Sequence, residues 1–256
     1  MGNKCKIYIV THKKFKPPVD PMYVPIQVGK QNTKKNLNIL SDDTGDNIAY
    51  KNANYCELTA LYWIWKNEMQ ADIIGMCHYR RYFVYGINSK LVDDYYIEKY
   101  LKNYDVIVPY EYKTESTVYN HFINSTSGRE RDLKNLRKII LSKYPEYVDD
   151  YDYIMNARST SYCNMFIMSK ENFKFYCSWL FDILFSLEEI TDLSGYTKQE
   201  RRIYGFLSEF LLNVWIKHNN LKKKYCSMYY IEDNKIKNFL KKIKLGCRSL
   251  IKNKGE

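Results

Sequence analysis

The 256-residue sequence lacks the patterns typical of a disulfide framework or a structural zinc site. Its seven cysteines are odd in number, none forms a C-x-x-C pair, and several sit inside apolar runs. Free cysteine in such a run behaves as a small hydrophobic residue. We therefore expect a protein of a reducing compartment.

Long apolar segments are also missing. No run of about 18 apolar residues occurs, and the longest candidate, residues 179–185, is interrupted by Asp182. The first residues lead directly into a strand-like segment at 7–10, without the pattern of a signal peptide. These features predict a cytoplasmic protein.

Acidic residues are too few to balance the basic ones, and the formal net charge is +11. Residues 222–256 hold eleven Lys or Arg against three Asp or Glu, a net +8, which leaves +3 for the rest of the chain. Because a nucleic-acid-binding domain carries its basic surface on the folded body, this distribution argues against nucleic acid as a partner.

Within that basic segment, residues 235–252 resemble a helix that binds a membrane surface. Ile236, Phe239, Leu240 and Ile243 would lie on one helical face, with lysines filling the rest. Such a helix lies on an anionic membrane surface, which predicts a peripheral location on the inner face of the plasma membrane. The alternative is a terminal helix that packs on its own domain or on a partner.

Short apolar segments alternate with amphipathic ones along the rest of the chain. The predicted strands are residues 6–10, 23–28, 73–77, 104–109 and 162–169, and the predicted helices are residues 52–66, 92–101, 119–144, 171–187 and 205–215. No internal repeat or low-complexity linker divides them. This order predicts a single α/β domain over residues 1–221, of Rossmann type with a mainly parallel central sheet, followed by a basic helical tail at 222–256.

One segment changes character within a few residues. Residues 73–77 are apolar, as in a strand buried on both faces, and His78, Tyr79, Arg80 and Arg81 follow at once. Ligands of open α/β sheets bind beyond the carboxyl ends of strands, where two guanidinium groups can bind phosphate oxygens. The alternative is a pair of arginines in surface salt bridges. On an extended strand His78 and Arg80 would share a face, with Arg81 opposite unless the chain turns.

Several blocks of the sequence together resemble a known family. They are DNI at 46–48, YCELTALYW at 55–63, GMCHYRRYF at 75–83, CNMFIM at 163–168, GFLSE at 205–209 and LNVW at 212–215. They resemble a bacterial capsular and exopolysaccharide biosynthesis family, long catalogued as a domain of unknown function. That family is associated with glycosyltransferases, including galactofuranosyltransferases, and the resemblance runs from about residue 6 to residue 215.

The order of elements is also similar to the GT-A fold of nucleotide-sugar transferases. In that fold a central strand ends in an Asp-x-Asp motif that binds Mn²⁺ or Mg²⁺, whereas this sequence has His78-Tyr79-Arg80 at the corresponding place. The resemblance implies a UDP-sugar donor and a lipid-linked saccharide acceptor. The departure from it implies that no metal cofactor is required, because cationic side chains replace the metal. Asp42, Asp43 and Asp46 leave a Mn²⁺ or Mg²⁺ site open as the alternative.

In this interpretation Arg80 and Arg81, with His78 as a further donor, stabilise the negative charge that develops on the leaving diphosphate. An inverting transferase also needs a general base for the acceptor hydroxyl. Glu209 is the candidate, since it is a carboxylate in an otherwise apolar helical segment where burial would raise its pKa. Its alternative is a structural pair with an arginine such as Arg202.

Other residues are candidates for binding the nucleotide. Thr11 and His12 follow the first strand, and Asp46, Asn47 and Asn52 could donate to or accept from uracil or ribose. The alternative for Asp46 and Asn47 is ordinary turn chemistry.

Three residues are candidates for contacting the sugars. Asn164 lies in an apolar segment and must find a hydrogen-bond partner, either a sugar hydroxyl or a backbone group. Tyr79 and Tyr82 could stack on a sugar or a base, or pack in the core. For Glu57, in another apolar helical segment, we favour a structural role.

The leading hypothesis is therefore a glycosyltransferase that uses a UDP-sugar such as UDP-galactofuranose. A transferase for a pyranose donor is the alternative within the same class. A non-catalytic scaffold subunit of a polysaccharide assembly complex is the alternative from another class.

Overall fold

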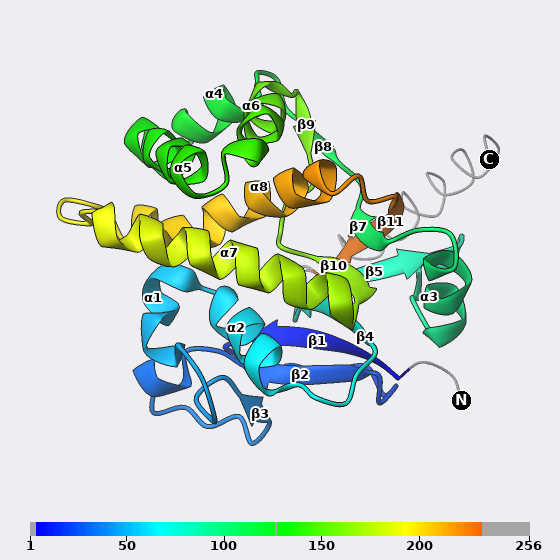
Figure 1. The fold of residues 1–256 in the computed structure, drawn as a ribbon. Coiled ribbons are helices and arrows are strands. Elements are labelled where there is room, and N and C mark those ends of the chain that lie inside the picture. The colour runs from blue at the N-terminus through cyan, green and yellow to red at the C-terminus, as the bar shows by residue number, and fades with distance from the viewer. Residues whose placement is uncertain (1–3, 126, 232–256) are drawn as a thin grey trace.

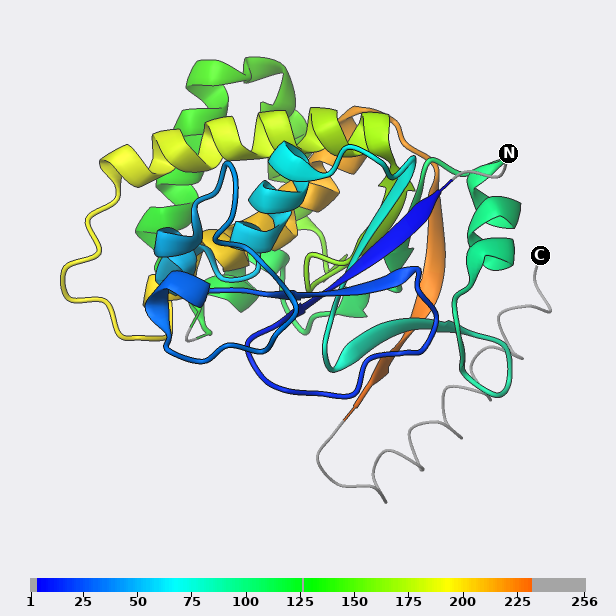
Figure 2. The same cartoon turned by 90° about the horizontal axis from the view of Figure 1, so that it is seen from below.

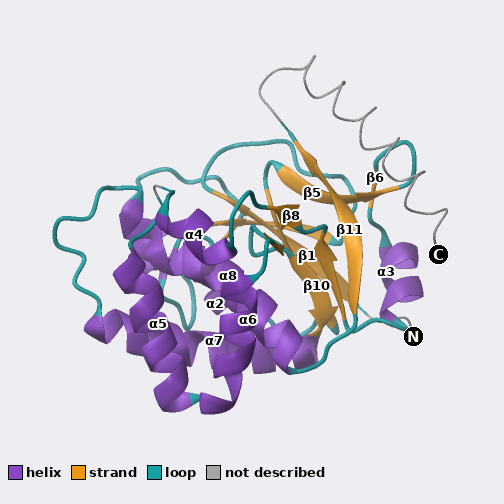
Figure 3. Ribbon diagram, turned by 90° about the horizontal axis from the view of Figure 1, so that it is seen from above, coloured by secondary structure: helices purple, strands orange, loops and turns teal. Residues whose placement is uncertain are grey.

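The computed structural model describes residues 4–125 and 127–231, which form a mixed β-sheet with most helices gathered on one face (Figures 1 and 3). The order of strands in this nine-stranded sheet is β3-β2-β1-β4-β10-β7-β11-β5-β6. The strands are β1 (Cys5–Thr11), β2 (Tyr23–Gln27), β3 (Leu40–Ser41), β4 (Ile73–His78), β5 (Arg81–Tyr85), β6 (Lys90–Leu91), β7 (Val106–Pro109), β10 (Phe166–Ser169) and β11 (Lys223–Tyr230). A separate two-stranded sheet joins β8 (Tyr112–Lys113) and β9 (Ser159–Thr160).

The α-helices are α1 (Asn52–Tyr55), α2 (Leu58–Asn67), α3 (Asp94–Leu101), α4 (Val118–Ile123), α5 (Glu130–Lys143), α6 (Val148–Asn156), α7 (Lys170–Ile190) and α8 (Ile203–His218). Four short 3₁₀ helices are η1 (Lys30–Asn32), η2 (Ala49–Lys51), η3 (Pro145–Tyr147) and η4 (Glu200–Arg202). In Figure 1, α1, α2, α7 and α8 lie on one side of the sheet, and α3 lies apart from them near β5. The alternation predicted from the sequence is confirmed as a mixed α/β fold.

The prediction of a mainly parallel sheet is not confirmed. Among the nine strand pairings of the large sheet, four are parallel and five are antiparallel. One cause is a two-residue hairpin turn at Tyr79 and Arg80, which sends β5 back against β4 with His78 opposite Arg81. The other is β10, which runs antiparallel to both of its neighbours.

Apart from the two-residue β3, which is parallel to β2, the parallel relations nevertheless bring five strand ends together. β1, β2 and β4 run in one direction. β4 and β7 both run against β10, so they share a direction, and β11 is parallel to β7. We call the edge where these five strands end the carboxyl edge. Figure 2 shows the dark blue β1, the β4–β5 hairpin and the orange β11 reaching it on the lower side of the view.

β11 lies beyond the domain boundary predicted at residue 221. It sits inside the sheet between β7 and β5, so the folded domain extends at least to Tyr230. Because this segment begins with lysines, it was not predicted as a strand from the sequence. Lys224 is accommodated because its ammonium group lies over the rings of Tyr100 and Tyr104, 4.3 and 5.5 Å from their centroids.

Residues 235–252, which the sequence predicts to form a membrane-binding helix, lie outside the described residues. Within residues 4–125 and 127–231, none of the helices is long and apolar enough to cross a membrane.

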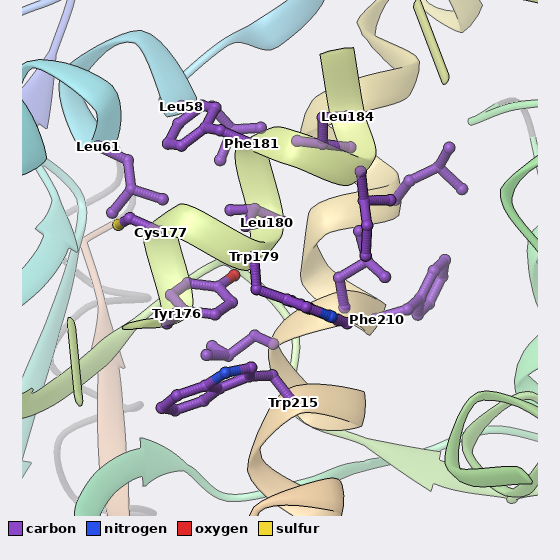
Figure 4. Packing of buried hydrophobic residues seen from close by; sticks show 14 of the residues in the cluster. Leu58, Leu61, Tyr176, Cys177, Trp179, Leu180, Phe181, Leu184, Phe210 and Trp215 are labelled. Atoms are coloured by element: carbon purple, nitrogen blue, oxygen red, sulfur yellow. The ribbon is translucent and has the colours of Figure 1, made fainter. Parts of the chain in front are cut away.

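α7 and α8 supply much of the hydrophobic core. Buried residues recur every three or four positions along α7, from Phe173 to Leu187, which is the spacing of one helical face. Figure 4 shows this face against α8, where Tyr176 lies 5.4 Å from Trp215 between ring centroids. Ser169 begins α7 by accepting a hydrogen bond from the backbone N–H of Asn172.

Leu180→Ala should lower the free energy of unfolding by about 3 kcal/mol, because truncating a buried leucine leaves a cavity and Leu180 is fully buried. Urea unfolding followed by circular dichroism measures this change. Leu141→Ala, at a leucine of α5 that is 51% exposed, is the matched control and should change stability by less than about 0.5 kcal/mol. Equal effects would show that the face of α7 is wrongly assigned.

Candidate functional site

The hairpin turn after β4 decides how the histidine and the two arginines are arranged. His78 and Arg81 face each other across the hairpin, and opposed residues of adjacent strands project to the same face. Arg80 lies in the turn itself, and its guanidinium stands 5.2 Å from the centroid of the Tyr79 ring and 5.8 Å from that of Tyr230. His78 therefore shares its face with Arg81, not with Arg80 as an extended strand would require.

A turn at Cys163 and Asn164 lies opposite this hairpin. The sequence predicted these residues as part of a strand, but both have positive φ, 83° and 49°. The left-handed region is strained for a residue other than glycine, at a cost of about 1–3 kcal/mol each. Such strain persists only where surrounding contacts hold the backbone.

The turn connects to three candidate site residues. The Nε2–H of His78 donates to the carbonyl oxygen of Cys163 at 2.6 Å, and the backbone N–H of Cys163 donates to the carboxyl group of Glu209. The side-chain amide of Asn164 donates to Glu57 Oε1 at 2.8 Å and to the Gly205 carbonyl at 3.1 Å. The strained pair thus links β4, α8 and the start of α2.

Glu209 has the properties expected of a general base. Burial, and after it the negative charge of Glu57, raises its pKa to about 8, although the Cys163 N–H, Arg81 and Arg202 act in the opposite direction. A pKa near the working pH suits a group that must both accept and release a proton. No ion pair between Glu209 and Arg202 occurs among the described residues, so Arg202 acts on Glu209 through its field.

His78 has a different role from the one expected. A carbonyl oxygen carries no hydrogen, so His78 must donate from Nε2. Burial lowers the pKa of the His78 ring, and Arg81 lowers it further, whereas Glu57 and the Cys163 carbonyl raise it. A neutral ring with Nε2–H already engaged is poorly suited to neutralise a diphosphate. We therefore assign His78 to positioning the turn.

Positive charge gathers at the carboxyl edge near the end of β1. The pKa of His12 is lowered by burial and then by Lys13, Arg80, Arg202 and Lys35. Lys13 is the next residue of the same loop, whereas Arg80 lies in the hairpin turn, Arg202 in η4 and Lys35 in the loop after η1, and all four act on this one imidazole. His12 also packs edge-on against Tyr79, with ring centroids 5.5 Å apart.

Other predicted nucleotide-binding residues are used by the loops themselves. The Thr11 hydroxyl is buried and both donates to the carbonyl of Lys13 and accepts from its N–H. The Asn52 amide donates to the Cys56 carbonyl at 2.7 Å and to the Thr59 hydroxyl at 3.1 Å. Asn52 also crowds Gly29, where a Cβ atom would lie 2.4 Å from its Oδ1. Thr11 and Asn52 thus stabilise the loops at the carboxyl edge through these contacts.

Asp46 and Asn47 are not brought to this cluster. Asp46 accepts from the Tyr62 hydroxyl, and Asn67, at the end of α2, donates to its carbonyl. Asn47 bonds with the backbone of Gly45 and of residue 49. This is the turn chemistry that the sequence left open, located along α2 and away from its start at Leu58.

The two tyrosines of the hairpin differ. Tyr82 is 3% exposed and packs in the core against Tyr23, so the structure contradicts its prediction as a substrate-stacking residue. Tyr79 is half-buried at the edge, between His12 and Phe15.

No group of three His, Cys, Asp or Glu side chains is arranged to hold a metal ion among the described residues. Asp42, one of the three acidic residues considered for metal binding, is fully buried. Its carboxylate accepts from the Gly29 N–H at 2.8 Å and from the Thr59 hydroxyl at 2.6 Å. Its neighbour Asp43 accepts from the Ser41 hydroxyl.

Sequence reasoning missed two charged residues of the site. Glu57 was assigned a structural role, yet its field acts on both Glu209 and His78. Arg202 donates from Nε to the sulfur of Cys56 at 3.2 Å and so stands beside Glu57 and Glu209. The signal for both was a charged residue that flanks an apolar helical run. Such a signal does not by itself distinguish a structural role from a role in the site.

Glu209→Gln should change how stability depends on pH. Because the folded pKa is raised from 4.5 to about 8, the folded state binds more protons than the unfolded state between these values. The native protein therefore loses stability as pH rises through this range. The neutral variant escapes that loss, and its melting temperature should rise relative to the native protein between pH 5 and pH 9.

Glu171→Gln, at an exposed carboxylate of α7, is the control for this measurement and should run parallel to the native protein between pH 5 and pH 9. A Glu209→Gln difference that stays constant with pH would show that Glu209 is ionised throughout and would remove the argument for a base.

Comparisons with known proteins place the chain among families and solved structures. The family model of a domain of unknown function, DUF4422, matches residues 6–220. None of the curated proteins matches the chain. Among solved structures, the apo structure of WbbM, a bifunctional glycosyltransferase, is similar with a TM-score of 0.82 and 31% sequence identity. The match covers 90% of this chain and 46% of that one, so this chain spans about half the length of WbbM.

Proposed function

Because the chain belongs to the family described as a domain of unknown function, DUF4422, and is similar to part of a bifunctional glycosyltransferase, we propose that it is itself a glycosyltransferase. The observation that carries this proposal is the position of Glu209. Its side chain has a raised pKa and lies close to the cationic groups at the carboxyl edge of the sheet. Glycosyl transfer needs both parts, since a proton leaves the acceptor while negative charge develops on the leaving group.

The proposed donor is a UDP-sugar whose diphosphate lies against the carboxyl edge. The cationic groups there are Arg80, Arg202 and Lys35 around His12, with Arg81 on the neighbouring strand. Arginine suits this task because its planar fork binds phosphate oxygens through two parallel hydrogen bonds. We propose that these side chains neutralise the diphosphate, so that transfer is independent of a metal ion.

The proposed reaction is a single displacement with inversion. The acceptor hydroxyl oxygen forms a bond to the anomeric carbon while the bond from that carbon to the diphosphate oxygen breaks, through a transition state of oxocarbenium character. Glu209, in its ionised form, takes the hydroxyl proton. Arg80 and the other cations hold the leaving UDP, and the turn at Cys163 and Asn164 fixes the position of Glu209.

The identity of the two sugars is the finer part of the proposal. From the family resemblance we propose galactofuranose as the donor sugar and a lipid-linked saccharide of capsule, exopolysaccharide or O-antigen synthesis as the acceptor. Such an acceptor is held in a membrane, which agrees with the proposed peripheral location through residues 235–252. A pyranose donor would use the same edge and the same base.

Arg80→Ala should weaken UDP binding by about tenfold or more, because charge-assisted hydrogen bonds to phosphate contribute about 1.5–3 kcal/mol. Isothermal titration calorimetry in EDTA measures this affinity for native protein and variant. Arg158→Ala, at an exposed arginine near β9, should bind UDP like the native chain. UDP binding that disappears in EDTA would contradict the metal-independent proposal, and unchanged affinity in the variant would remove Arg80 from the site.

Glu209→Gln should keep UDP binding and lower the rate of transfer by about 10²–10⁴-fold, the usual contribution of a general base. In the native enzyme kcat/KM should rise with pH toward a plateau above about 8, the value to which the pKa of Glu209 is raised. Transfer of radiolabelled sugar from UDP-galactofuranose and UDP-galactopyranose tests both predictions. Native-like turnover in the variant would exclude Glu209 as the base, and absence of transfer from every donor would favour a scaffold subunit.

A further inference from the structure

A hollow near the C-terminal end of α8 lies apart from Glu209, which is in the first half of that helix. This surface hollow of about 570 Å³ opens between the first half of α7, the end of α8 and η3. Its residues on α8 are Trp215 and, just after the helix, Asn219. Ten residues separate Glu209 from Asn219, or about 15 Å along a helix. The volume is within the range of about 300–1,000 Å³ typical of small-molecule sites.

The floor of this hollow, which we call the aromatic hollow, is built from fixed rings. Tyr147 stacks on Trp179 with centroids 4.8 Å apart and on His218 with centroids 3.6 Å apart. The side-chain amide of Asn219 donates to the Tyr147 hydroxyl at 3.2 Å. Figure 4 shows Trp179 and Trp215 on facing sides of α7 and α8. A preformed floor lowers the ordering cost of binding a ligand.

Phe175 forms an exposed wall of the aromatic hollow. It is 62% exposed, and it precedes the buried Trp179 by one helical turn on α7. Asn172 and Ser178, three residues before and after it, also line the hollow. Residues spaced by three or four lie on one helical face, so α7 presents an apolar ring flanked by an amide and a hydroxyl.

The charges around the hollow indicate a neutral ligand. The nearby basic side chains, Lys217 and His218, both contact the Asp150 carboxylate, at 3.4 and 3.0 Å. The polar lining consists of the uncharged Asn172, Ser178 and Asn219 and of the carboxylate of Glu146, which would repel an anionic ligand. A nucleotide or phosphate would require free cationic groups. A saccharide fits better, since the C–H face of a sugar ring can pack on an aromatic ring while its hydroxyls bond to amides and hydroxyls.

We propose that the aromatic hollow binds a neutral saccharide segment of the acceptor or product chain, at a distance from its reacting end. The choice of ligand rests on the proposed glycosyltransferase function, whereas the site itself rests on the hollow and its lining. Such a site would retain a growing chain between successive encounters with donor.

The test is an NMR titration of the full chain with β-linked galactotetraose, with galactose as the monosaccharide control and UDP as the probe of the carboxyl edge. The tetrasaccharide should shift the indole N–H signals of Trp179 and Trp215 and leave those of Trp63 and Trp65 unchanged. Phe175→Ala should weaken this binding by about tenfold, since it removes the exposed stacking surface, and should leave UDP affinity unchanged. Tyr95→Ala, at a 73% exposed aromatic residue of α3, is the matched control.

The outcomes separate this proposal from the proposed function. Shifts confined to the carboxyl edge, no shifts at all, or equal affinity of native protein and Phe175→Ala would overturn the saccharide site. Tetrasaccharide binding in the hollow, lost in Phe175→Ala, would support it even if no sugar were transferred. Loss of transfer in Glu209→Gln with hollow binding intact would show that the two sites are separate.

Discussion

The strained turn at Cys163 and Asn164 is the constraint on which the rest of the site depends. Its two positive φ angles orient one carbonyl toward His78, one N–H toward Glu209 and one amide toward Glu57. Strain of this kind is maintained only where several contacts hold the backbone. Here those contacts come from β4, α8 and the start of α2, so the core that packs these elements also fixes the carboxyl group proposed as the base.

The mixed sheet serves the site because of where its parallel strands end. β1 and β4 place His12 and the hairpin turn at one edge, and α8 approaches the same edge with Arg202 and Glu209. This arrangement brings cationic groups, which we propose to bind the anionic leaving group, close to a carboxyl group of raised pKa. Opposite charges nearby would lower that pKa, but burial and Glu57 outweigh them. In the proposed function, the balance between these effects would allow acid–base chemistry and anion binding in one place.

Much of the fold could be predicted from the sequence, because helix and strand periods are local properties. The apolar runs of β4 and α8 and the isolated carboxylate Glu209 belong to this class. Pairing direction is not local, so the strand of β10 was predicted but its antiparallel direction was not, and the inserted β11 was missed. The hydrogen bond of His78 to Cys163 could not be predicted, and the choice between stacking and core packing for Tyr82 stayed open, because both depend on contacts between residues distant in sequence.

Burial and the negative charge of Glu57 keep Glu209 protonated near neutral pH in the free protein, and they outweigh the Cys163 N–H, Arg81 and Arg202, which lower its pKa. Direct titration of the Glu209 side-chain carboxyl by carbon-detected NMR, in protein labelled at glutamate, tests this most directly. The account predicts an apparent pKa of about 8. A carboxyl group that titrates near 4.5, the ordinary value for glutamate, would contradict it.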